Sequence, residues 1–304
     1  MVQVHLSTQA NNKALVQASF DRWRSGTGSP FELLSPEVEW GIVSSPPARL
    51  GAPPPPVITT YHGQRQFLDE VVQPLNGRLA TPLLPTVRAI YADGDTVIVL
   101  FDVAAAMRCG MNYYNTYAWF LEIKQARVVS VIAFFDTVVC EYSTYVAPAY
   151  RIYGSPTAGD RLATQANNKA LVQASFDRWK SGTGGPFELL SAEVEWTIVE
   201  HFESKTYRGR EKFLDYIIRP LNARMQTPFV PTVRHIYAEG DAVVILFDAA
   251  GTPRGGFPYR NTYAWFFEMS EAKVVNLVAY FDTMMAVARD WDSDQGDIRG
   301  AALL

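Results

Sequence analysis

The segment Thr8–Gly28, TQANNKALVQASFDRWRSGTG, occurs twice in this chain. It returns at Thr164–Gly184 with a single change, Lys180 in place of Arg24. A repeat of this kind defines the architecture, because each copy of a repeated sequence folds as the same unit. The period is much longer than that of a solenoid, so the sequence predicts two copies of one domain.

Later segments repeat at a shorter spacing. Asn115–Phe120 returns as Asn261–Phe266, a spacing ten residues shorter than that of the opening segment. The extra residues of the first copy fall in 44–60, which contains Pro53–Pro56 and is expected to form an extended surface loop. The predicted organisation is a first domain at 8–146, a linker at 147–163, a second domain at 164–290 and an acidic tail at 291–304.

Composition excludes several classes of protein. The chain has 304 residues, of which 48% are hydrophobic and 19% charged, with a net charge of −4. The absence of a basic run argues against a nucleic-acid partner. No apolar run reaches the roughly 20 residues of a membrane span, and the N-terminal residues lack the core of a signal peptide. Cys109 and Cys140 have no metal-ligand spacing, so we interpret them as free thiols and expect a cytoplasmic protein.

Within one copy, helices precede strands. Val16, Phe20 and Trp23 have the spacing of one face of an opening helix. A second apolar helical stripe covers 67–75, where Pro74 is expected to kink or end the helix. Strands are predicted at 37–43, 85–92, 95–104, 113–123 and 128–138. This order indicates an α+β fold with tandem cone-shaped domains, in each of which a curved antiparallel or mixed sheet wraps around the N-terminal helices.

Short motifs recur in the order of a known family. They are the Phe-Asp-Arg-Trp helix (Phe20–Trp23 and Phe176–Trp179), the Tyr-x-Gly-x start of the second helix (Tyr207–Arg210), the Ala-Glu-Gly-Asp hairpin (Ala238–Asp241) and the closing Tyr-Phe-Asp strand (Tyr280–Asp282). With this order, the chain resembles the nuclear transport factor 2-like superfamily, specifically its SnoaL-like and ketosteroid-isomerase-like branch. The resemblance covers nearly all of both copies.

The resemblance implies a bent sheet around helices, with a deep pocket at the open end. Members of the family include polyketide cyclases, steroid isomerases, limonene epoxide hydrolases, dehydratases and non-catalytic binders, so the fold narrows the function poorly. Many members are homodimers that pack through their sheets. The two fused copies are therefore expected to form an intramolecular pseudo-dimer, and further oligomerisation stays open.

Asp102 and Asp248 are the first catalytic candidates. Each ends a strongly apolar strand, where aspartate is disfavoured, and the resemblance to limonene epoxide hydrolases implies that this position faces the pocket. Apolar surroundings would raise the pKa of such a carboxyl group and allow it to act as a base or a hydrogen-bond donor. The alternative is a structural aspartate bonded to a neighbouring tyrosine or backbone amide.

The remaining epoxide hydrolase pattern is missing. Leu100 and Leu246 stand where that family has an arginine, and Ala133 and Ala279 stand where it has a further aspartate. We therefore reject epoxide hydrolysis for both copies. The steroid isomerase base is also absent, because Trp40 and Trp196 lie near the position expected for its aspartate.

His235 is the third catalytic candidate. If Glu239-Gly240 is a two-residue turn, His235 pairs with Val244 and shares a sheet face with Leu246 and Asp248. An imidazole in the pocket would carry a proton, and scytalone-dehydratase-like members have a pocket histidine on the equivalent strand. The alternative is a histidine satisfied by one structural hydrogen bond. Since the first copy has Ala89 here, the second copy is the better candidate for catalysis.

Aromatic and amide side chains are the predicted ligand-binding set. Asn115 and Asn261 are flanked by tyrosines within strand patterns, and such groups orient a ligand carbonyl. They otherwise make sheet-edge or inter-domain hydrogen bonds. The tryptophans are expected in the core or the pocket wall. The predicted set is Trp23, Trp40, Asn115, Tyr117, Trp179, Trp196, Tyr207, Asn261 and Tyr263.

Two classes of function remain after these arguments. The leading hypothesis is a SnoaL-like enzyme that performs acid–base chemistry (isomerisation, cyclisation or dehydration) on a small apolar, oxygenated metabolite, with no cofactor and no metal. The alternative is a protein that binds a small ligand, or serves assembly, and has lost the catalytic residues of the family. An open cavity with convergent polar groups would favour ligand binding, whereas an interior filled by tryptophans would favour assembly.

Overall fold

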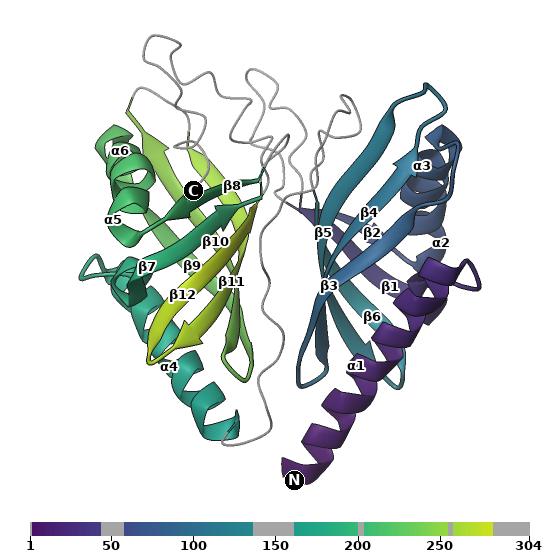
Figure 1. Ribbon diagram of the computed structural model, residues 1–304, viewed down its shortest axis with the longest axis horizontal. Helices are drawn as coiled ribbons and strands as arrows, with labels where there is room; N and C mark the ends of the chain where they lie inside the picture. Colours follow the sequence, from purple (N-terminus) through teal and green to yellow (C-terminus); the bar gives the residue numbers. More distant parts are fainter. Residues whose placement is uncertain (1, 44–57, 136–160, 200–203, 255–257, 282–304) are drawn as a thin grey trace. The chain divides into compact units, whose positions relative to one another are not determined.

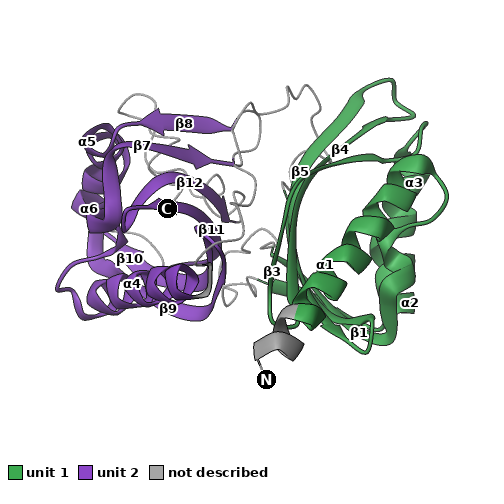
Figure 2. Ribbon diagram, turned by 60° about the horizontal axis from the view of Figure 1, so that its bottom comes forward, with its two compact units in different colours: residues 1–44, 58–152, 201–203 green, residues 45–57, 153–200, 204–304 purple. Residues whose placement is uncertain are grey.

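The computed structural model describes residues 2–43, 58–135, 161–199, 204–254 and 258–281. They form two compact units, which Figure 2 colours separately. Unit 1 contains the first copy of the repeat and unit 2 the second. Most of the predicted insertion and linker, and the whole acidic tail, lie outside the described residues, so the predicted domain boundaries stay predictions.

Unit 1 begins with helices and ends in a sheet (Figure 1). Its helical elements are α1 (Val2–Ser25), the 3₁₀ turn η1 (Pro30–Leu33), α2 (Gln64–Phe67), the π turn η2 (Leu68–Val72) and α3 (Gln73–Arg78). Its strands are β1 (Leu34–Val43), β2 (Ile58–His62), β3 (Leu84–Asp93), β4 (Thr96–Ala106), β5 (Asn112–Lys124) and β6 (Arg127–Phe135).

Unit 2 repeats this order. Its helical elements are α4 (Arg161–Ser181), η3 (Pro186–Leu189), α5 (Arg210–Phe213), the π turn η4 (Leu214–Ile218) and α6 (Arg219–Arg224). Its strands are β7 (Leu190–Ile198), β8 (Lys205–Arg208), β9 (Met225–Glu239), β10 (Ala242–Pro253), β11 (Tyr259–Ser270) and β12 (Lys273–Phe281).

Each unit has one mixed sheet of six strands. The order in unit 1 is β2-β1-β6-β5-β4-β3, and unit 2 has the equivalent order β8-β7-β12-β11-β10-β9. The pairs β1–β6 and β7–β12 are parallel, while the other neighbours are antiparallel. In Figure 2 the sheet of unit 1 curves around α1, α2 and α3. The predicted α+β fold with two cone-shaped domains is confirmed.

The helices occupy the concave side of each sheet. Val16 and Phe20 are fully buried on α1, as their spacing predicted, and the Phe20 ring lies 4.8 Å from the Phe101 ring of β4. The second helix is interrupted by the π turn η2 just before Pro74, which has no N–H to donate to the helical ladder. The predicted kink is thus a widened turn.

One charge pair differs between the copies. In unit 1, Glu122 bonds to Lys124 at 2.7 Å. In unit 2, Ser270 replaces this lysine, and Oε2 of the equivalent Glu268 is buried without a hydrogen-bond partner. Burial, and then the charge of Asp241, raise the pKa of Glu268 above 4.5. The carboxylate form of Glu268 is therefore disfavoured in the folded protein.

This difference predicts a pH effect on stability. Because the folded pKa exceeds the unfolded one, the contribution of Glu268 is present below about pH 4.5 and is lost as the pH rises through the folded pKa. Glu268→Gln is expected to flatten that part of the stability profile in thermal unfolding between pH 4 and 7. Ser270→Lys should add up to about 0.5 kcal/mol at pH 7. An unaltered profile in Glu268→Gln would contradict the assignment.

Candidate functional site

Strand alternation decides which side chains reach the concave side of the sheet. On β4, Val99, Phe101 and Val103 belong to the core of unit 1, whereas the intervening Leu100 and Asp102 point to the opposite face. Tyr113, Tyr117 and Trp119 on β5 share the concave face. The sheet therefore has an inner face that lines the interior and an outer face that does not.

Unit 1 contains an open pocket of about 790 Å³ on this inner face. Its lining combines the sheet (β1, β4, β5 and β6), the end of α1 and the segment from α2 to the start of β3. The volume lies in the range of small-molecule sites, and most of the lining side chains are apolar. The first unit thus has an open, mostly apolar cavity of a size that small molecules occupy.

Aromatic rings form the pocket wall. Trp40 stacks on Phe67 with ring centroids 3.8 Å apart and meets the edge of Trp119 at 5.0 Å. Trp23 stacks on Trp119 at 6.2 Å, and Phe31 lies among these rings. These contacts fix each ring through its neighbours, so the wall is preorganised and offers flat apolar surfaces to a ligand.

A short polar ladder follows β5 along the inner face. The hydroxyl oxygens of Tyr113 and Tyr117 are 2.6 Å apart, and both residues line the pocket. Asn115, between them, donates from Nδ2 to the Tyr113 oxygen at 3.5 Å, and its Oδ1 accepts from the Thr116 amide. Two phenols and an amide therefore converge within an otherwise apolar wall, as sites that orient a ligand oxygen do.

Unit 2 shows the same ladder, with a shorter Asn–Tyr bond and a longer distance between the two tyrosine oxygens. Asn261 Nδ2 donates to the Tyr259 oxygen at 2.9 Å, which lies 3.1 Å from the Tyr263 oxygen. Burial, and then the neighbouring Tyr259, raise the pKa of Tyr263 well above its usual value of 10. The Tyr263 hydroxyl therefore keeps its proton at neutral pH and is able to donate a hydrogen bond.

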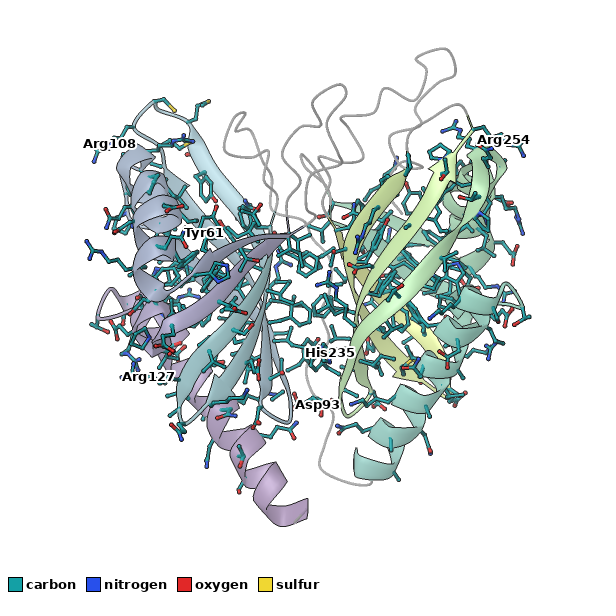
Figure 3. The ribbon with its side chains drawn as sticks, turned by 180° about the vertical axis from the view of Figure 1, so that it is seen from behind. Tyr61, Asp93, Arg108, Arg127, His235 and Arg254 are labelled. Carbon is teal, nitrogen blue, oxygen red and sulfur yellow. The ribbon has the colours of Figure 1, made fainter. Side chains whose placement is uncertain are left out.

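Polar residues near the pocket mouth were missed by sequence reasoning. Tyr61, Glu70 and Arg78 all line the unit 1 pocket; Figure 3 labels Tyr61. Burial, and then the charge of Glu70, raise the pKa of Tyr61. A usable signal existed in the sequence, because a carboxylate, Glu70, stands where the second copy has Tyr216, between the repeated segments Phe67–Asp69 and Pro74–Asn76.

The expectation that Asp102 faces the pocket is wrong. Its flanking residues, Phe101 and Val103, belong to the core of the inner face, so the Asp102 side chain lies on the outer face. There its Oδ2 accepts from Arg88 Nε and Nη2 at 2.7 and 2.6 Å, and its Oδ1 accepts from Thr116 Oγ1 at 2.8 Å. Asp102 is the structural aspartate of the alternative interpretation, held by an arginine and a threonine.

Asp248 has the same orientation. Phe247 and Ala249 line the interior of unit 2, which places Asp248 on the outer face. Arg234 contacts Asp248 Oδ2 at 3.0 Å, and Thr262 donates to Oδ1 at 2.7 Å. The Asp248 carboxylate is thus engaged away from any pocket residue, and the geometry gives it no access to a ligand of unit 2.

His235 also lies outside the pocket. It pairs with Leu246, not with Val244, because the β9–β10 turn is Gly240-Asp241 instead of Glu239-Gly240. Moving the turn by one residue shifts the pairing by two, so the predicted sharing of a face with Asp248 holds. That face is the outer one, however, and His235 is exposed on it (Figure 3).

Among its described residues, unit 2 has much less open space at the equivalent position. Its equivalent cavity measures only about 40 Å³. Larger side chains replace smaller ones along the second helix and the next strand. The larger replacements are Val71 by Ile217, Val72 by Ile218 and Leu83 by Phe229, while Met225 replaces Leu79 at about the same volume. The isoleucines, the methionine and the phenylalanine are all buried. The larger cavity thus lies in the first copy, whereas the sequence favoured the second copy for catalysis; which copy is catalytic stays a prediction.

The predicted ligand-binding residues divide between the two units. Trp23, Trp40 and Tyr117 line the open pocket, and Asn115 adjoins it. Trp179 and Tyr263 line the small cavity of unit 2, and Asn261 belongs to its polar ladder. Trp196 and Tyr207 pack in the core of unit 2.

Comparison with known proteins agrees with this geometry. Residues 168–277 match a family model described as the SnoaL-like domain. The second repeat is a SnoaL-like domain. The first repeat has the same strand order and an almost identical opening helix, so the chain contains two tandem copies of the SnoaL-like fold.

Several solved structures resemble one SnoaL-like copy. A protein of Jannaschia sp. CCS1 described as a SnoaL-like polyketide cyclase is 16% identical, with 43% of this chain and 95% of that chain covered (TM-score 0.35). An NTF2-like protein of Burkholderia thailandensis E264 is 18% identical, with 40% and 94% covered (TM-score 0.35). An epoxide hydrolase of M. tuberculosis, similar to limonene epoxide hydrolase, is 18% identical, with 41% and 90% covered (TM-score 0.33).

Three further findings are negative. No curated protein sequence matches this chain. Among the described helices, none combines the length and apolar character needed to cross a membrane. Within the same described ranges, no group of three or more histidine, cysteine or acidic side chains is placed to hold a metal ion.

Proposed function

We propose that the first SnoaL-like copy binds a small, mostly apolar molecule that carries at least one oxygen atom. The observation that carries this proposal is the open pocket of about 790 Å³, whose aromatic wall contains the hydroxyl pair of Tyr113 and Tyr117. Flat rings would be held between the indoles of Trp23 and Trp40. The phenols would donate a hydrogen bond to a carbonyl or hydroxyl oxygen.

The second copy has a different role in this proposal. With a cavity of about 40 Å³ it has room for no more than one or two water molecules. Buried side chains larger than those of the first copy occupy the equivalent space, as Phe229 does in place of Leu83. We infer that it serves as a stable scaffold for the chain. The expected pairing of the two copies through their sheets, and a cytoplasmic location, stay predictions.

Acid–base catalysis is a second candidate, and Glu70 is the observation that favours it. Among the described lining residues of the open pocket, Glu70 is the only carboxylate, and its charge acts on Tyr61. With Asp102, Asp248 and His235 on outer faces, Glu70 would be the base and the Tyr113–Tyr117 pair would stabilise negative charge on the substrate oxygen. Isomerisation, cyclisation or dehydration would then need no cofactor.

The binding proposal is tested with the two copies as each other's control. Tyr117→Phe is expected to weaken binding of the compound that copurifies with the protein, identified by mass spectrometry, about five- to tenfold. Loss of one hydrogen bond of about 1 kcal/mol gives this change. Tyr263→Phe, the matched change in the filled copy, should leave the affinity unaltered. Equal effects of the two substitutions, measured by calorimetry, would refute the assignment of the site to the first copy.

The catalytic candidate needs a separate measurement. Glu70→Gln keeps the size of the side chain and removes its charge and basicity. If Glu70 is a base, turnover of the identified compound should fall at least about a hundredfold while its affinity stays within threefold. Unaltered turnover would rule out Glu70 as the base, and no turnover in the parent protein would leave the chain as a binding protein.

A further inference from the structure

Three arginines without a carboxylate partner lie near the mouth of the open pocket. Several other arginines of unit 1 are paired with carboxylates: Arg22 with Glu32, Arg65 with Asp69, and Arg88 with Asp102. Among the described residues, no acidic side chain pairs with Arg24, Arg78 or Arg108. Arg127, at the other end of the unit, also lacks a carboxylate partner among these residues and donates to the backbone oxygen of Glu32 at 2.8 Å. Arg24, Arg78 and Arg108 are distinguished by their position at or next to the pocket.

Arg78 is the closest of the three to the ligand space. It ends α3 and is itself a lining residue of the pocket, and its carbonyl oxygen accepts a hydrogen bond from the Arg108 amide at 2.9 Å. Arg24 lies in a surface groove that shares Trp23, Thr81 and Tyr113 with the pocket. Figure 3 shows Arg108 at the end of unit 1 opposite to Asp93 and Arg127.

Comparison of the two copies favours a role of Arg78 in ligand binding over a role in stabilising the fold. Arg224, the counterpart of Arg78 in the filled copy, is half-buried, and its Nη1 atom is enclosed by protein. Arg78 is exposed at the rim of an open cavity. The same residue is therefore packed where the pocket is closed and accessible where the pocket is open.

We propose that the ligand of the first copy is an anion: an apolar ring body with one acidic oxygen group, such as a carboxylate, bound by Arg78. This inference rests on the proposed binding function. The rings would occupy the aromatic wall, and the acidic group would lie at the mouth, where the guanidinium binds its oxygens without drawing a charge into the apolar interior. Arg24 and Arg108 would raise the local concentration of the anion.

Two fluorescent probes of similar shape test the proposal. 1-Anilinonaphthalene-8-sulfonate carries a sulfonate, and N-phenyl-1-naphthylamine has the same rings without it. Arg78→Met is expected to weaken binding of the sulfonate probe about tenfold and to leave the neutral probe within twofold, because methionine keeps much of the apolar stem. Raising the ionic strength should weaken only the sulfonate probe.

Control variants make each outcome decisive. Arg65→Met changes an exposed arginine that does not line the pocket, and should alter neither affinity. If Arg78→Met weakens both probes equally, or neither, the anion inference is overturned while pocket binding stands. If neither probe binds the parent protein, the proposed function fails together with the inference. Selective loss of the sulfonate probe supports both.

Discussion

Replacing Asp102 with alanine is expected to lower the free energy of unfolding of the first unit by about 3 kcal/mol. The Asp102 side chain is 9% exposed and that of Arg88 is 17% exposed, so the substitution leaves a guanidinium largely buried without its counter-charge. Removing one partner of such a pair typically costs about 3–5 kcal/mol. Urea unfolding measures the loss, and hydrogen exchange of the β4 and β5 amides assigns it to unit 1.

The second copy again supplies the control. Asp248 is 13% exposed, but its partners Arg234 and Arg260 are 31% and 63% exposed, so water can solvate them after Asp248→Ala. We expect a loss of about 1 kcal/mol there. In both variants the folded protein should bind the pocket ligand as before. A folded Asp102→Ala protein of normal stability that no longer binds ligand would return Asp102 to the site.

Filling the open pocket is expected to abolish binding. The triple variant Val71→Ile, Val72→Ile, Leu83→Phe gives the first copy the side chains that fill the second. Because these residues already pack together in unit 2, the variant should fold normally and bind the neutral naphthylamine probe at least about a hundredfold more weakly. Fluorescence titration and a thermal melt measure the two properties.

The reverse change should open the second copy. Ile217→Val, Ile218→Val and Phe229→Leu remove buried atoms next to a cavity of about 40 Å³. We expect a loss of stability of about 3 kcal/mol in total, since each truncation leaves space that the surroundings refill only in part. A second probe site should appear in the titration. If the triple variant of the first copy described above still binds the probe, the probe lies outside the pocket of the first copy.

The fold was predictable because the sequence segments that indicate it occur twice in the chain. The nearly identical segments Thr8–Gly28 and Thr164–Gly184 predicted the two units, and the spacing of Val16 and Phe20 predicted the buried helix face. The orientation of Asp102 was not predictable. Its strand is apolar without interruption, since Leu100 on the outer face is as buried as Phe101 on the inner one. Without alternation, sequence does not show which face an aspartate occupies.

The location of the open pocket could have been inferred in part. The two copies differ at Val72 and Ile218, and at Leu83 and Phe229, so the second copy has more side-chain volume around the same space. Whether added volume fills a cavity or points to solvent depends on the packing of the second helix. Tyr216, which replaces Glu70, is 64% exposed and fills nothing. The partner of Asp102 was missed because Arg88 reaches it past a bulge in β3.

The near-identity of α1 and α4 poses a problem for the newly made chain. Phe20 and Phe176 make the same edge contact with the sheets, at 4.8 Å to Phe101 and 4.9 Å to Phe247. They also lie at similar distances along the chain from Phe101, one before it and one after, so the entropy of loop closure hardly separates the correct helix from the wrong one. During synthesis α1 leaves the ribosome first, so it can pack against the sheet of unit 1 before α4 has been made. When a complete chain refolds after dilution from denaturant, both helices are present from the start. Some molecules should then be trapped with α4 packed on the sheet of unit 1.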